Sequence, residues 1–201
     1  MLGGYGKSFS AGADLKDSPG SSSPGATGRQ KRHAIQVGRR AIAAIERVEG
    51  ITIAKVQGHA IGGGFGLMCA CDFRFVTADS RLYLPEVNIQ VPLTWGLTAR
   101  LIRDIGRPKA MELITLCDDL PPAQAESLGL INGVAQSEAE LEELVNTTAN
   151  RLTGQNETTL HLVKTQFRAL DHAVDSGDVT EMDNDMLLYR GLLDQQPKCR
   201  L

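Results

Sequence analysis

Hydrophobic residues recur with two different periods along the first two thirds of the chain. β-Branched and apolar residues dominate segments 51–58 and 72–78, which predicts two buried strands, and shorter strands are expected at 82–84 and 129–135. Helical spacing of apolar residues predicts helices over 29–48, 65–71, 97–105, 108–116 and 121–128, with Pro in the first turn of two of them. Strands that alternate with helices indicate an α/β fold.

The last third of the chain shows only the helical period. Amphipathic helices are expected over residues 137–152, 158–171 and 179–193. We therefore predict a core over residues 1–135 and a helical region over 136–201. The apolar stripe of the first helix fits packing against a second copy of the chain or against its own core; it includes Leu141, Leu144 and Val145.

A segment rich in Ser, Gly and Pro, residues 17–28, predicts a flexible surface loop. The helix expected after it carries a basic stretch. This stretch fits a solvated helix face, or a contact for a phosphorylated ligand. Its members are Arg29, Lys31, Arg32, Arg39 and Arg40.

Composition and charge exclude several classes of protein. The 201 residues are 42% hydrophobic and 22% charged, as in a globular domain, and the net charge of −3 offers nucleic acid no general attraction. Apolar runs stay well short of the roughly 20 residues of a membrane-spanning helix. The first residues lack the apolar core of a signal peptide. We expect a cytoplasmic protein that binds neither nucleic acid nor membrane.

Cysteine and histidine spacing points away from metal chemistry. The Cys69–Cys71 pair lacks a second pair to complete a zinc site, and the four histidines are scattered. We expect reduced, buried thiols and no bound metal.

Common nucleotide and hydrolase motifs are absent or incomplete. The segment GGYGKS resembles a phosphate loop, but Met1 stands where the first Gly of that motif belongs. The chain has neither the dinucleotide pattern G-x-G-x-x-G nor the serine elbow G-x-S-x-G.

A stronger candidate is the glycine cluster HAIGGGFGLMCAC, which follows an expected strand and opens an expected helix. Glycines let the backbone approach a ligand closely, and free N–H groups there favour an anionic oxygen. A close-packed turn without a ligand explains the cluster equally well. A second small-residue segment, SFSAGADLK, could supply another backbone donor facing the first, as in an oxyanion hole.

Three segments in this order resemble the crotonase superfamily, the enoyl-CoA hydratases and isomerases. They are GKSFSAGADLK, AIGGGFGLMCACDFRFVTADSRLYLPEVNIQVPLTWGLTARLIRDIG and DDLPPAQAESLGLINGV. The resemblance implies a crotonase-like spiral of β-β-α units with a helical C-terminal region. It also implies a homo-trimer or hexamer built through those helices.

The resemblance implies an acyl-CoA substrate, with coenzyme A as part of that substrate and no other cofactor. Ala13 and Gly63 would donate their backbone N–H groups to the thioester oxygen, and Glu86 would be the catalytic acid/base. The remaining implied contacts with the substrate and its CoA are Ser10, Ala11, Asp14, Leu15, Lys16, Ile61, Gly62 and Trp95. Asp72 is expected to be structural, and Asp14 is expected to anchor the backbone as well.

Gly66 departs from the family pattern, because hydratases carry a second glutamate at that position. A single carboxylate beside an oxyanion hole can still move a proton between the α and γ carbons of an enoyl thioester. The sequence therefore favours isomerase-type chemistry, and the alternative is a catalytically impaired relative that binds acyl-CoA or a protein partner.

Two further departures concern Trp95 and the start of the chain. Trp95 replaces small residues of many hydratases, and by its size it is expected to shorten or reshape the acyl site. Family members place strands and a helix before the segment that here begins at Phe9. The sequence leaves three explanations open: a misassigned start, a fragment, or a shortened paralogue.

Overall fold

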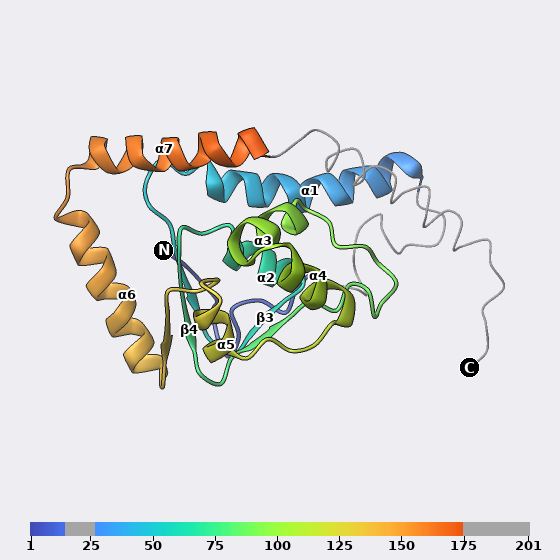
Figure 1. The fold of residues 1–201 in the computed structure, drawn as a ribbon, viewed down its shortest axis with the longest axis horizontal. Coiled ribbons are helices and arrows are strands. Elements are labelled where there is room, and N and C mark those ends of the chain that lie inside the picture. Colours follow the sequence, from blue (N-terminus) through green and yellow to red (C-terminus); the bar gives the residue numbers. More distant parts are fainter. Residues whose placement is uncertain (15–26, 175–201) are drawn as a thin grey trace.

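The computed structural model of the chain describes residues 1–14 and 27–174 (Figure 1). A parallel sheet has the order β1-β2-β4-β6, formed by β1 (Leu2–Gly3), β2 (Ile53–Val56), β4 (Phe73–Thr77) and β6 (Gly133–Ala135). Two further strands, β3 (His59–Ile61) and β5 (Arg81–Tyr83), pair in parallel as a second, small sheet. The helices are α1 (Gly28–Glu46), α2 (Gly63–Cys69), α3 (Leu97–Ile105), α4 (Arg107–Leu116), α5 (Pro122–Ser127), α6 (Glu138–Thr153) and α7 (Glu157–Val174).

Side chains alternate between the two faces of the main sheet, as the strand period of two requires. Ile53 and Phe75 face one way and pack with Leu141 and Val145 of α6. Ala54, Val56 and Val76 face the other way, into the larger core. Figure 1 accordingly shows α6 on one side of the sheet and α2, α3 and α4 on the other.

The apolar stripe of α6 therefore has its partner within the same chain. Leu141 and Val145 are almost fully buried against the sheet, and Leu144 packs on the same cluster. Of the two C-terminal helices described, α7 is the one that exposes large apolar side chains: Leu162, Val163, Phe167 and Leu170 are 41–68% exposed.

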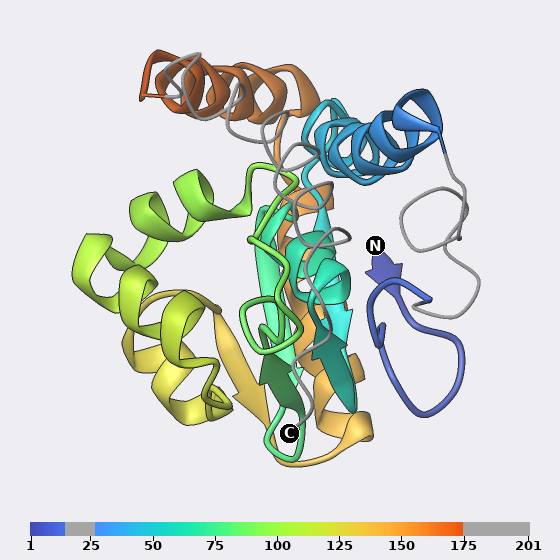
Figure 2. The same ribbon diagram turned by 90° about the vertical axis from the view of Figure 1, so that its right-hand side faces the viewer.

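Helix α7 is joined to the sheet layer by one buried cation. The ammonium of Lys164 donates to the Gly50 carbonyl at 2.9 Å and to Asp72 Oδ2 at 2.7 Å. Asp72 also accepts from the N–H and hydroxyl of Thr52, so its expected structural role agrees with its contacts. Figure 2 shows α7 and α1 across the same end of the molecule.

Helix and strand positions expected from the sequence match the structure to within a few residues, with two instructive differences. Helix α1 begins at Gly28, inside the expected loop, because Thr27 and Gln30 form a capping box. Strand β3 was not expected, because three residues are too short for an alternating pattern to be seen. Most of the expected loop (residues 15–26) and the expected helix 179–193 lie outside the described residues.

Three cysteines within the described part of the chain, Cys69, Cys71 and Cys117, are free and buried, as expected. Burial raises the pKa of Cys69 to about 12 and that of Cys71 to about 11, so both thiols stay protonated at neutral pH. Within residues 1–14 and 27–174, no helix combines the length and the apolar character needed to cross a bilayer.

Candidate active site

The two small-residue segments singled out in the sequence lie side by side. The Ser10 N–H donates to the His59 carbonyl at 2.8 Å, and the Ile61 N–H donates to the Ser10 carbonyl at 3.0 Å. These two bonds form a parallel bridge between Ser10 and Ala60. The bridge places the first segment next to the glycine turn that follows β3.

Glycine is required where the segments meet. A Cβ on Gly12, which has φ +89°, would stand 2.7 Å from the Ile61 carbonyl oxygen and 3.6 Å from the amide nitrogen of Gly63. Ala13 follows Gly12 directly, so its backbone and that of Gly63 belong to the same small region. The Gly63 N–H is in the first turn of α2, where no preceding helical carbonyl can accept it.

Glu86 reaches this region from the loop after β5. A Cβ on Gly62, which has φ +53°, would lie 2.8 Å from Glu86 Oε1. The loop holds the residue in place, because its carbonyl accepts from the Val91 N–H at 2.8 Å and the Pro85 carbonyl accepts from the Ile89 N–H at 3.1 Å. Glu86 Oε2 is buried and has no hydrogen-bond partner among the described residues.

The electrostatics of Glu86 follow from that burial. Removal from water raises the pKa of its carboxyl above the ordinary value, and a hydrogen bond to its own backbone partly offsets this. A carboxylate with a raised pKa is a stronger base than an ordinary glutamate, and its unused oxygen is available to accept a proton.

The position of the absent second carboxylate is filled by hydrocarbon. A Cβ on Gly66 would lie 3.1 Å from Ile42 Cδ1 and 3.7 Å from Leu97 Cδ2. Ile42 and Leu97 are each 2% exposed. The face of α2 that would carry a second acid is therefore closed by α1 and α3.

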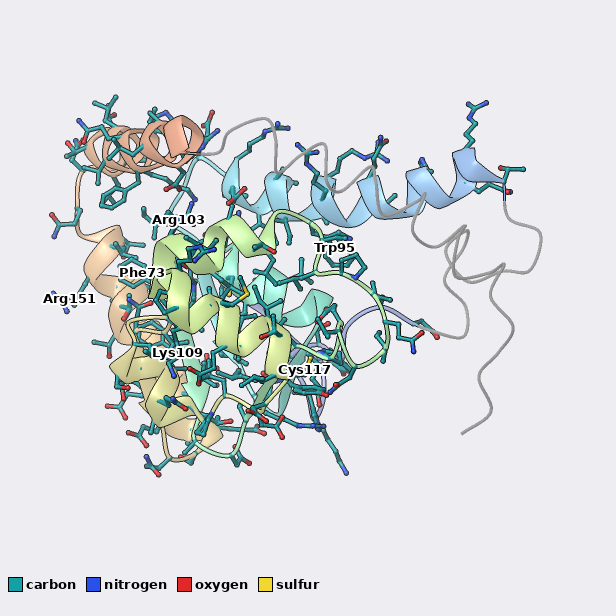
Figure 3. The ribbon with its side chains drawn as sticks, turned by 45° about the vertical axis from the view of Figure 1, so that its right-hand side comes forward. Phe73, Trp95, Arg103, Lys109, Cys117 and Arg151 are labelled. Carbon is teal, nitrogen blue, oxygen red and sulfur yellow. The ribbon has the colours of Figure 1, made fainter. Side chains whose placement is uncertain are left out.

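Trp95 lies against the same glycine turn. A Cβ on Gly63 would come within 2.6 Å of indole Cη2, and a Cβ on Gly38 of α1 would overlap the opposite part of the ring. Figure 3 shows Trp95 just below α1, in the loop that leads to α3. Its backbone is left-handed, with φ +63°, and Gly96 follows with φ +73°.

The enoyl-CoA hydratase/isomerase family model matches residues 1–196. The chain belongs to this family. It is 35% identical over 163 residues to a peroxisomal Δ(3,5)-Δ(2,4)-dienoyl-CoA isomerase of Arabidopsis thaliana, an alignment that covers 78% of this chain and 59% of the relative. It is 32% identical over 186 residues to a crotonyl-CoA hydratase of Syntrophomonas wolfei subsp. wolfei, covering 92% of this chain and 66% of the relative.

A solved enoyl-CoA hydratase from Bacillus anthracis has the same fold. The two structures agree with a TM-score of 0.76 at 29% identity, over 96% of this chain and 72% of that one. The crotonase resemblance and the α/β crotonase-like fold expected from the sequence are thus confirmed. The chain spans 59–66% of the length of the two curated relatives.

The structure describes most of the residues that are expected to contact the substrate in this member of the enoyl-CoA hydratase/isomerase family. Ser10 and Ile61 are half-buried at the meeting point of the segments, and the Ser10 hydroxyl accepts from the Gly12 N–H at 3.3 Å. Ala11, Ala13 and Asp14 are exposed, as fits backbone that presents itself to a ligand. Leu15 and Lys16 lie outside the described residues.

Sequence reasoning missed the contribution of α1 to the site of this family member. Gly38 lies against Trp95, and Ile42 lies against Gly66. The sequence predicts only that Gly38 and Ile42 belong to an ordinary amphipathic helix. The one available signal was Gly38 itself, because a glycine inside a helical pattern usually has a packing reason.

Proposed function

We propose that this protein is an enoyl-CoA isomerase-type enzyme, in which Glu86 moves a proton along an enoyl thioester. The supporting observation is the Glu86 carboxylate beside the Gly62–Gly63 turn: its buried Oε2 has no hydrogen-bond partner in the described part of the chain, and hydrocarbon fills the place where a second acid would stand. Relatives of this chain carry both isomerase and hydratase names, so the choice between the two rests on the site.

The proposed reaction begins with the thioester carbonyl bound by the N–H groups of Ala13 and Gly63. Glu86 removes a proton from the α carbon of a Δ3-enoyl thioester, and the C–H electron pair passes into the enolate. The double bond then moves to the α,β position as Glu86 returns the proton to the γ carbon, so no atom is gained or lost. Each backbone donor can contribute roughly 3 kcal/mol to stabilising the enolate oxygen.

Hydration would need a water held and activated beside the substrate. In the proposed mechanism Ile42 and Leu97 occupy that side of α2, and neither side chain can donate or accept a hydrogen bond. Glu86 is left as the acid/base for a proton shift that uses no water.

The other expected contacts are part of this proposal. Ser10, Ala11, Asp14, Leu15 and Lys16 would follow the CoA and pantetheine, while Ile61 and Gly62 would contact the thioester. The chemistry uses no metal or redox group, and CoA arrives with the substrate. We also propose the cytoplasm as its compartment.

The test is a paired turnover assay on the purified chain. We expect 3-hexenoyl-CoA isomerisation to exceed crotonyl-CoA hydration by at least about 10-fold, and Glu86→Gln to lower isomerisation by about 100-fold or more. Glu126→Gln, at an exposed position on α5, is the matched control and should keep wild-type activity. Hydration that exceeds isomerisation, or isomerisation that survives Glu86→Gln, would contradict the proposal.

The absence of a carboxylate at position 66 also favours a second candidate, a non-catalytic acyl-CoA-binding relative. Such a protein would bind CoA esters yet turn over neither substrate. Isothermal titration with crotonyl-CoA, run beside the two assays, separates the candidates.

We further propose that the chain forms a homo-trimer or hexamer through α7. The support is its exposed apolar row, in which Val163, Phe167 and Leu170 follow helical spacing on one face.

A further inference from the structure

The indole of Trp95 is lodged between two glycines that come from different helices. One edge of its six-membered ring faces Gly63 at the start of α2, and the edge that includes Nε1, Cε2 and Cζ2 lies against Gly38 of α1. A Cβ at either glycine would overlap the ring. The slot for the indole exists because both helices lack a side chain there.

The surroundings of Gly38 show that α1 is fitted to this ring. Gly38 is buried, and Ile42, one turn later on the same helix face, is the residue that fills the space before Gly66. Val37, the residue directly before Gly38, is 48% exposed. Helix α1 therefore faces the site with Gly38, whereas Val37 is exposed.

Glu86 and the Trp95 indole lie beside two consecutive residues, Gly62 and Gly63. Glu86 Oε1 faces Gly62 and the indole edge faces Gly63, and consecutive Cα atoms are about 3.8 Å apart. The base and the indole therefore both border the Gly62–Gly63 turn, where the thioester is proposed to bind.

We propose that Trp95, held in place by Gly38, closes the far end of the acyl pocket and restricts the protein to short acyl groups. The inference rests on the proposed acyl-CoA function and adds its substrate class. Trp95 would contact the substrate, whereas Gly38 is a positioning residue that acts through the indole.

The test compares binding of two saturated esters that undergo no double-bond shift, butanoyl-CoA and decanoyl-CoA, with CoA itself as reference. By isothermal titration, the wild-type chain should bind butanoyl-CoA at least about 10-fold more tightly than decanoyl-CoA. Trp95→Ala should raise decanoyl-CoA affinity by about 10-fold or more and leave CoA affinity unchanged. Trp95→Phe, which keeps a smaller ring, should bind decanoyl-CoA with an affinity between those of the wild type and Trp95→Ala.

Gly38→Ala tests the positioning role with a readout that needs no ligand. The chain contains one tryptophan, so its fluorescence reports on this indole alone. Gly38→Ala should shift the emission maximum and weaken butanoyl-CoA binding, while the matched control Val37→Ala should do neither. If Gly38→Ala does not fold, the Trp95 variants still decide the matter.

The possible failures can be told apart. If folded protein binds the esters but Trp95→Ala leaves the preference between butanoyl-CoA and decanoyl-CoA unchanged, the short-chain inference is wrong and the proposed function stands. If no CoA ester binds, the proposed function fails, and this inference fails with it.

Discussion

At the scale of single residues, the chemistry of the site depends on Glu86 and on what surrounds it. Its Oε1 lies beside Gly62, where any side chain would displace it, and its Oε2 is buried. The glycine turn therefore leaves room for the carboxylate, one oxygen of which is buried. This placement raises the pKa of Glu86 through desolvation.

The raised pKa of Glu86 makes a prediction about stability and pH. The folded state holds this proton more tightly than the unfolded state, so protonated Glu86 favours folding below the unfolded-state pKa. That contribution is lost as the pH rises through the folded-state pKa. We expect the unfolding free energy of the wild type, relative to Glu86→Gln, to decline in urea titrations as the pH rises above the ordinary pKa of a glutamate. A difference that stays constant or rises with pH would contradict the burial of Glu86.

Gly66 makes a second prediction at this scale. Gly66→Glu would place a carboxylate among Ile42 and Leu97, so we expect a loss of about 2–4 kcal/mol in urea unfolding and no gain in crotonyl-CoA hydration. The control Gly66→Ala should be nearly neutral, because its tight contact with Ile42 opposes a helix-propensity gain of about 1 kcal/mol. Efficient crotonyl-CoA hydration by Gly66→Glu would contradict this prediction, because it would show that the space beside residue 66 can hold a second catalytic carboxylate.

At the scale of elements, α1 couples the site to the rest of the fold. Its capping box fixes where the helix begins, and its inward face then presents Gly38 and Ile42 to Trp95 and Gly66. Expected apolar positions such as Val37 and Val48 are instead about half exposed. The face that matters is the one with small and branched residues at positions 38, 42 and 45.

The contact between α1 and Trp95 predicts that Gly38→Ala changes the unfolding free energy in opposite directions when the indole is present and when it is removed. Gly→Ala inside a helix normally stabilises by about 1 kcal/mol, but at Gly38 the new Cβ would overlap the indole, so we expect Gly38→Ala to destabilise. In a Trp95→Ala background the same change should become stabilising. Urea unfolding of the four proteins forms a double-mutant cycle, and additive effects would rule the contact out.

At the scale of the whole molecule, the apolar surface is distributed unevenly over the two C-terminal helices. Helix α6 packs its stripe on the sheet, whereas α7 is held by the buried Lys164 and leaves an apolar row exposed. Exposed apolar rows of this kind mark association surfaces.

The proposed trimer or hexamer should therefore depend on α7. Phe167→Asp combined with Leu170→Asp should yield monomers in sedimentation velocity, because a desolvated carboxylate at an interface is strongly unfavourable. Leu116→Asp, at a 60% exposed position on α4, is the control and should leave the assembly intact. A wild-type monomer, or an oligomer that survives the α7 changes, would disprove this interface.

Much of the fold was determined by the sequence itself. The period-two segments became β2 and β4, and the prolines at the starts of α4 and α5 fall in their first turns, because these signals act between residues close along the chain. The ordered motifs were also enough to predict the crotonase superfamily, and to name Glu86, Ala13 and Gly63 as candidates.

Only the tertiary structure decided how those candidates are surrounded. It placed Gly12 beside Gly63, turned Glu86 onto Gly62, set Ile42 and Leu97 over Gly66, and fitted Trp95 between Gly38 and Gly63. The physical reason is that each contact joins segments far apart along the chain. Local propensity can position a residue on a helix or a loop, but which atoms it meets depends on how α1, α2 and the loop after β5 pack together.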